Sequence, residues 1–121
     1  MKIDMKQVSK RIENPTALEW FSVIAETREK DRSNKIYENL AKLLNKRNSI
    51  KVNLWKLGKY SKEGDYLIVP GKVLGVGSLD HKISICAIDF SESALEQLLK
   101  SNSTVLKIKD ALSKKGFKII I

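Results

Sequence analysis

The sequence has 121 residues, of which 42% are hydrophobic, so it is long enough for one domain with a modest core and is not a wholly disordered chain. Lys and Arg number 23 against 14 Asp and Glu, which gives a formal net charge of +9 at pH 7. Residues 1–60 hold 14 basic and 7 acidic side chains and residues 61–121 hold 9 and 7, so the excess lies mainly in the N-terminal half. A charge of this size on a small domain favours a polyanionic partner.

The sequence also predicts a cytoplasmic protein without a membrane partner. No segment approaches the roughly 20 apolar residues that span a bilayer. The residues from Met1 to Lys6 show no apolar run typical of a signal peptide. Because Cys86 is the only cysteine, it cannot form an intramolecular disulfide, which fits a reducing compartment.

Residues 1–13 are polar and basic and show little periodicity, so we expect a basic N-terminal arm there. Residues 14–121 are expected to form a single domain, in which two helices precede short strands mixed with short helices. This order predicts an α+β or irregular α/β fold, without the regular strand–helix–strand spacing of a doubly wound domain.

Two amphipathic helices are expected first. Asn14 and Pro15 match the N-cap and the first position of a helix, which we expect to end near residues 28–30. The polar turn at residues 31–34 separates it from a second helix. One face of that helix carries Ile36, Tyr37, Leu40, Leu43 and Leu44. Because the connection is so short, the two helices are expected to pack as a hairpin.

After Asn48 the pattern becomes strand-like. A short extended segment is expected around Val52, Leu54 and Leu57, followed by a loop over residues 58–65. Short strands are expected at residues 66–69, 72–74 and 83–88. The Pro and Gly residues of the segment from Val69 to Gly77 predict a corner between the first two of these strands, from which Lys72 is free to meet a phosphate.

The C-terminal third is expected to contain two short helices and a terminal strand. Residues 89–96 contain several possible caps, including a capping box of Ser93 and Glu96, for a short helix that ends near Lys100. The next helix is expected to be closed by Gly116 and to point a set of apolar residues inward: Val105, Ile108, Ala111 and Leu112. Residues 117–121 complete the chain as a strand.

No residues form a recognisable catalytic, metal or cofactor site. The glycines of the 69–77 segment fit neither a dinucleotide-binding motif nor a P-loop. His81 beside Asp80 in a turn is not by itself a base with an orienting group, and Cys86 lies in an apolar run that favours a buried thiol. We therefore expect neither enzymatic activity nor a cofactor, a metal ion or a small-molecule substrate.

Basic residues make the strongest physical case for a function. They follow the second helix into the next segment at Lys42, Lys46, Arg47 and Lys51, continue at Lys56 and Lys59, and line the arm at Lys2, Lys6, Lys10 and Arg11. Such a surface can follow a folded RNA by its shape and phosphates. The other interpretation of the group around Lys42 is an ordinary solvated helix face. Trp55, which lies among these lysines, is expected to be partly buried, with base stacking as the alternative.

Four motifs occur in order along nearly the whole chain: Arg11-x-x-Asn14-Pro15, Arg47-x-x-x-x-Val52-Asn53-Leu54, Val69-Pro70-Gly71-Lys72-Val73-Leu74-Gly75-x-Gly77 and Phe90-Ser91-x-x-Ala94. Together they resemble the large-subunit ribosomal protein family numbered eighteen-e of archaea and eukaryotes, which is related to the bacterial large-subunit ribosomal protein numbered fifteen. The Pro-Gly-Lys-Val-Leu-Gly segment is the most specific of them. A length of 121 residues resembles the archaeal form.

The resemblance implies a structural, non-enzymatic constituent of the large ribosomal subunit. Such a protein binds and stabilises large-subunit rRNA in support of translation and adjoins neighbouring ribosomal proteins. The resemblance also implies an irregular superhelix of strand–strand–helix turns after an N-terminal helical hairpin. By the family pattern Arg11, Asn14, Arg47, Asn53 and Lys72 lie near RNA. The candidate RNA-binding residues are then Lys6, Lys10, Arg11, Asn14, Lys42, Lys46, Arg47, Lys51, Asn53, Lys56, Lys59 and Lys72.

A free-standing nucleic-acid-binding regulator is the alternative. The short turn at residues 31–34 permits a helix-turn-helix whose second helix reads a groove. Acidic residues on both helices weaken this interpretation, among them Glu19, Glu26, Glu29 and Glu38.

Overall fold

A computed structural model describes residues 15–31, 33–114 and 116–121. The expected basic arm at residues 1–13 and Asn14 lie outside the described residues. In chain order the elements are α2 (Pro15–Lys30), α3 (Ile36–Asn45), η1 (Arg47–Ser49), β1 (Lys51–Asn53), α4 (Leu54–Lys59), β2 (Tyr66–Leu74), β3 (Ser84–Phe90), α5 (Glu92–Lys100), β4 (Thr104–Val105), α6 (Ile108–Ser113) and β5 (Lys118–Ile119).

The described strands form one parallel sheet in the order β1-β2-β3-β4, with β5 also paired to β2. β1 pairs with β2 at residues 72–74, near the C-terminal end of that strand, and β5 pairs at residues 67–68, near its start. The two central strands are buried along most of their length, as is usual for parallel strands with helices on both faces.

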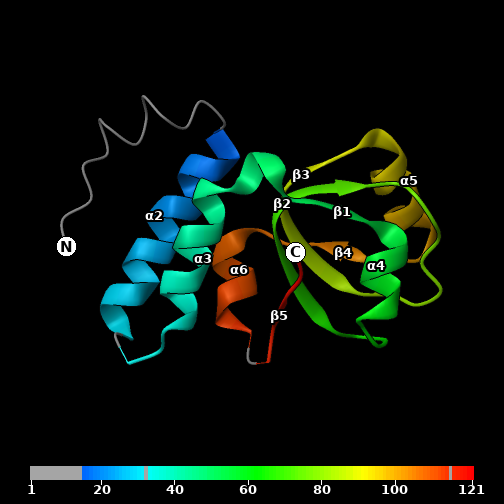
Figure 1. Ribbon diagram of the computed structural model, residues 1–121. Helices are drawn as coiled ribbons and strands as arrows, with labels where there is room; N and C mark the ends of the chain where they lie inside the picture. Colours follow the sequence, from blue (N-terminus) through cyan, green and yellow to red (C-terminus); the bar gives the residue numbers. More distant parts are fainter. Residues whose placement is uncertain (1–14, 32, 115) are drawn as a thin grey trace.

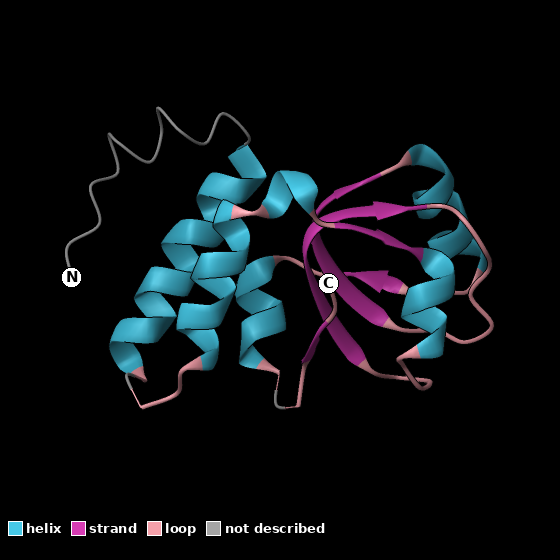
Figure 2. Cartoon of the chain, viewed as in Figure 1, coloured by secondary structure: helices cyan, strands magenta, loops and turns pink. Residues whose placement is uncertain are grey.

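Helices cover both faces of the sheet, and each face has its own core (Figure 1). On one face α2, α3 and α6 pack against Ile68, Cys86 and Ile88. On the other face α4 and α5 pack against a second group of buried strand residues: Val52, Leu67, Val69, Val73, Ile85 and Ala87. Figure 2 shows the resulting helix–sheet–helix layers. The predicted mixed α/β class and the N-terminal helical part are confirmed.

The predicted hairpin is also confirmed, because α2 and α3 lie side by side in opposite directions (Figure 1). The α2 helix ends at Lys30, within the expected range. In the turn, the Ile36 amide donates a hydrogen bond to Asn34 Oδ1 at 3.1 Å, and an ion pair of 3.2 Å joins Arg28 to Glu38 across the two helices. This antiparallel pair differs from the crossed helices of a helix-turn-helix.

The predicted corner in the 69–77 segment is wrong. β2 continues through Pro70 and Gly71 as one strand, and its register against β3 shifts between Val69 and Lys72. The glycine is needed for a close approach, since a Cβ at residue 71 would overlap the backbone carbonyl oxygen of Ile50. The proline and the glycine therefore form a local irregularity within β2, where the segment that contains Ile50 packs against the strand.

For the helices on the α4–α5 face, one expectation is wrong, and the structure selects one of the several caps considered for the other helix. Leu54 and Leu57 belong to the short helix α4, which buries both of them, and not to an extended segment. The N-cap of α5 is Ser91, whose hydroxyl accepts a hydrogen bond from the Ala94 amide at 3.1 Å, so Ser93 does not cap this helix. Burial of its leucines against the sheet accounts for α4, whereas the Ser91 hydroxyl marks the start of α5.

The last expected helix begins later than predicted. Val105 lies in β4 and is half exposed, because its segment pairs with β3 at the edge of the sheet. α6 begins at Ile108, and Ile108, Ala111 and Leu112 are buried as expected. The terminal strand is confirmed as β5, although it is shorter than predicted.

Candidate nucleic-acid interface

The structure groups four of the candidate basic residues where α3 leads into the sheet. Lys42 lies on α3, Lys46 follows its last turn, Arg47 begins η1 and Lys51 begins β1. The three lysines are exposed, and in the part of the chain that is described none of them has a carboxylate within ion-pair distance. We call Lys42, Lys46, Arg47 and Lys51 the basic ridge.

Arg47 is the most fixed member of the ridge. Its guanidinium donates a hydrogen bond from Nη1 to the carbonyl oxygen of Leu44 at 3.1 Å, and the residue is half-buried. This carbonyl belongs to the last turn of α3, where a cation is favoured by the helix dipole. Arg47 therefore ends the helix and holds a positive charge beside the exposed lysines.

Lys72 extends the ridge across the sheet. It is the register partner of Lys51 on the neighbouring strand, and the next pair along, Val52 and Val73, is buried under α4 and α5. Because side chains alternate between the faces of a strand, Lys51 and Lys72 project from the opposite face, the one that carries α2 and α3. The Lys72 ammonium lies 3.8 Å from a carboxylate oxygen of Asp89, which offsets part of its charge.

Lys56 and Lys59 are not brought to the ridge. Both belong to α4, which packs on the other face of the sheet. The Lys56 ammonium donates a hydrogen bond to the Ile121 main-chain oxygen at 2.5 Å, and the Lys59 ammonium lies 5.4 Å from the ring centre of Tyr60.

Asn53 lies between the two groups at the end of β1, and its side-chain oxygen is buried without a hydrogen-bond partner among the described residues. Lys6, Lys10, Arg11 and Asn14 lie outside the described residues.

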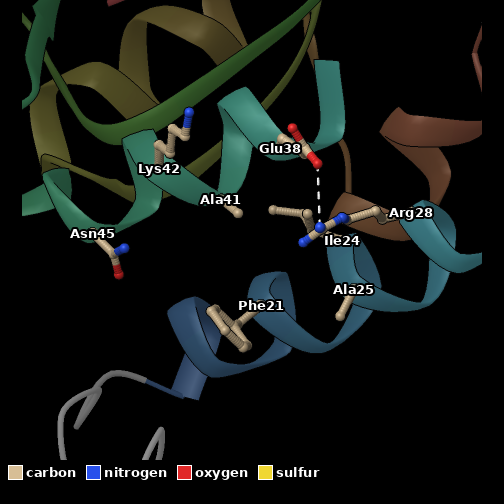
Figure 3. A pocket seen from close by; sticks show the side chains of 8 residues that line it. All are labelled: Phe21, Ile24, Ala25, Arg28, Glu38, Ala41, Lys42 and Asn45. Atoms are coloured by element: carbon tan, nitrogen blue, oxygen red, sulfur yellow. Dashed lines mark ion pairs between the residues drawn. The ribbon is translucent and has the colours of Figure 1, made fainter. Parts of the chain in front are cut away.

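A groove beside the ridge was not predicted from the sequence. It lies between α2 and α3 and has a volume of about 380 Å³. Phe21 and Ala25 on one helix face Ala41 and Asn45 on the other, and the ion pair of Arg28 with Glu38 lies at one end (Figure 3). Lys42 also lines the groove and so joins it to the ridge. The small side chains at 25 and 41 were visible in the sequence, but their position opposite each other depends on how the helices pack.

The structure also places Trp55, His81 and Cys86, the aromatic and reactive side chains considered in the sequence, and the second tryptophan, Trp20. Trp20 is buried in the core, and Trp55 is half exposed. His81 Nε2 is hydrogen-bonded to the Ser61 hydroxyl at 2.8 Å. Burial, with smaller contributions from Glu19 and Asp110, raises the pKa of the Cys86 thiol to about 12, so this thiol is neutral and unreactive at neutral pH.

In residues 15–31, 33–114 and 116–121, no group of three or more His, Cys, Asp or Glu is placed to hold a metal ion. In the same residues, no helix is both long and apolar enough to cross a membrane.

Comparison with known proteins identifies the family. No family model matches the chain. It is 46% identical over 68 residues to the large ribosomal subunit protein eL18 of Sulfurisphaera tokodaii, an alignment that covers 55% of this chain and 58% of that protein. It is 38% identical over 90 residues to eL18 of Methanococcus maripaludis, covering 71% of this chain and 75% of that protein.

A third relative, eL18 of Thermoplasma volcanium, is 37% identical over 83 residues, which is 67% of this chain and 68% of that protein. The alignments with the Sulfurisphaera tokodaii and Sulfolobus acidocaldarius proteins span only 58% and 52% of their lengths. The resemblance inferred from the four motifs is nevertheless confirmed by the longer alignments. This chain belongs to the eL18 family of large ribosomal subunit proteins.

Proposed function

We propose that this protein is a structural constituent of the large ribosomal subunit in the cytoplasm and that it binds large-subunit rRNA through the basic ridge. Its membership of the eL18 family supports the ribosomal assignment. The observation that carries the RNA contact is that Lys42, Lys46 and Lys51 are exposed and unneutralised among the described residues. Exposed lysines without a carboxylate partner contribute most to the free energy of RNA binding, because each contact with a phosphate releases condensed counterions.

The ridge is suited to reading the shape of RNA and not its base order. Three of its members are lysines, which act as point charges on flexible stems and do not impose the planar fork geometry of arginine. Arg47 is the exception, since its bond to the Leu44 carbonyl leaves further N–H groups for a phosphate in a fixed position. The ridge therefore combines one positioned contact with several adaptable ones.

Lys72 has a secondary place in this proposal. Asp89 already shares its charge, so a phosphate would have to compete with that carboxylate. Surface ion pairs of this kind are weak, at about 1 kcal/mol or less, so the competition is possible at little cost. The main contact is thus assigned to the basic ridge itself: Lys42, Lys46, Arg47 and Lys51.

The proposed role is architectural and not catalytic. The relatives are named as subunit proteins. Neutralising phosphates on adjoining RNA segments lowers their mutual repulsion, which is how a small basic domain stabilises a folded RNA.

Sedimentation with ribosomal particles tests the assignment. The protein is expected to travel with the large subunit in moderate salt and to leave it only in high salt. A Lys46→Gln/Lys51→Gln variant should leave at lower salt than the unaltered protein. Lys82→Gln is the control for loss of one lysine elsewhere, and the single variant Lys46→Gln matches it in charge, because Lys82 is exposed just before β3, at the other end of the strands from Lys51. The assignment is wrong if the unaltered protein stays at the top of the gradient in moderate salt.

A further inference from the structure

The face of the molecule formed by α5 and the edge of the sheet is apolar and acidic, unlike the ridge. On α5 the residues Glu92, Leu95, Glu96 and Leu99 recur at helical spacing, and all four are exposed. Leu99 is 77% exposed and Leu95 is 42% exposed. The opposite side of the helix supplies the core contacts through Ala94 and Leu98, so the two exposed leucines contribute little to the fold.

A groove of about 310 Å³ lies beside this stripe and contains an open sheet edge. β4 pairs with β3 only at Ser84 and Ile85. Beyond that point the strand continues along residues 86–90, which line the groove, and no other described strand pairs with it on that side. Leu95 and the half-exposed Val105 lie at the same groove, so apolar side chains flank the open edge.

The charges of this face favour a basic partner. Glu19 and Asp89 line the groove, and Glu92 and Glu96 flank the exposed leucines. The nearby basic residues are Lys107 in the lining, Lys100 on the helix, and Lys72, which faces Asp89. Four carboxylates against three ammonium groups give a local net charge of about −1 on a protein whose formal charge is +9. RNA phosphates would be repelled here, whereas a segment rich in Lys and Arg would be attracted.

We propose that this surface, which we call the acidic groove, binds an extended segment of another protein that carries Lys or Arg in alternation with apolar side chains. The apolar side chains would contact Leu95, Leu99 and Val105. The backbone of the segment would add to the open edge of β3, a common mode of peptide recognition. This inference goes beyond the proposed rRNA contact and does not depend on it, because the two surfaces share only Asp89, which lines the groove and faces Lys72.

Binding of defined peptides to the full chain tests the proposal. The probe is a short fluorescent peptide of alternating lysine and valine, and its binding is followed by anisotropy. Peptides of alternating lysine and serine or of alternating glutamate and valine serve as controls. The lysine–valine peptide is expected to bind at least about tenfold more tightly than either control. If the lysine–serine peptide bound as tightly as the lysine–valine peptide, the contact would be electrostatic only, and the proposal would be overturned.

Variants locate the contact. The Leu95→Ser/Leu99→Ser variant should bind the lysine–valine peptide about tenfold more weakly. The Glu92→Gln/Glu96→Gln variant, which keeps the volume of both side chains, should bind it severalfold more weakly. The Lys46→Gln/Lys51→Gln variant should keep its affinity for the peptide and lose affinity for rRNA. Failure of one proposal can therefore be told apart from failure of the other. Amide chemical shifts that move at the ridge and not along residues 86–99 would contradict the inference. The inference would also be contradicted if an rRNA fragment displaced the peptide from its contact with residues 86–99.

Discussion

The carbonyl oxygen of Ile50 occupies the place where a side chain at Gly71 would begin. The same oxygen accepts a hydrogen bond from the Lys72 amide at 2.9 Å. This contact brings the segment before β1 against the middle of β2, and it sets the register that pairs Lys51 with Lys72. The glycine thus determines where the basic ridge meets the sheet.

Gly71→Ala should therefore destabilise the fold. The added Cβ forces the Ile50 backbone away, and overpacking of this kind costs about 2–3 kcal/mol in the free energy of unfolding. Gly58→Ala is the control, because a Cβ there meets only ordinary contacts at 3.7 Å, inside helix α4. Alanine is the better helix former, so this variant should gain about 0.5–1 kcal/mol. Chemical denaturation measures both, and equal effects would disprove the role given to Gly71.

The fold was predictable where local pattern and packing agree. The apolar spacing of the residues after Pro15 located the hairpin, because the face that is apolar in the sequence is buried in the structure. Pro70 and Gly71 misled because they usually mark turns. Their actual cause is the approach of Ile50, a contact between segments some twenty residues apart that no local pattern records.

The N-cap of α5 can be tested by a pair of serine variants. Ser91→Ala should lower the free energy of unfolding by about 1 kcal/mol, since the Ala94 amide loses its acceptor. Ser93→Ala should change it by no more than about 0.5 kcal/mol, as expected for an exposed residue that is not the cap. Thermal or urea unfolding compares the two. A larger loss at residue 93 would favour the capping box expected from the sequence.

Cys86 should make stability fall in alkaline solution. Burial, first, and the charges of Glu19 and Asp110 raise the native pKa of its thiol from 9.0 to about 12. In the unfolded chain the thiol ionises at its ordinary pKa, so the stability from the neutral thiol is complete below pH 9 and is lost as the pH rises toward 12. Unfolding measured across this range should show a steeper decline for the unaltered protein than for Cys86→Ala. Parallel curves would mean that the thiol is not buried in a neutral state.

The candidate site was predictable in composition but not in arrangement. The sequence placed Lys42, Lys46, Arg47 and Lys51 together because they follow one another at the end of a helix. It also joined Lys56 and Lys59 to them, although α4 crosses to the other face of the sheet. That crossing depends on burial of α4 against β-strands that come later in the chain, which sequence spacing alone does not show.

The salt dependence of rRNA binding tests the central claim most directly. The logarithm of the affinity of the unaltered protein for large-subunit rRNA should fall steeply with the logarithm of the salt concentration. Lys46→Gln/Lys51→Gln should bind more weakly and reduce that slope by about 0.7–0.9 for each lost phosphate contact, while Lys82→Gln should match the unaltered protein. The same slope and affinity for all three proteins would contradict binding through the basic ridge.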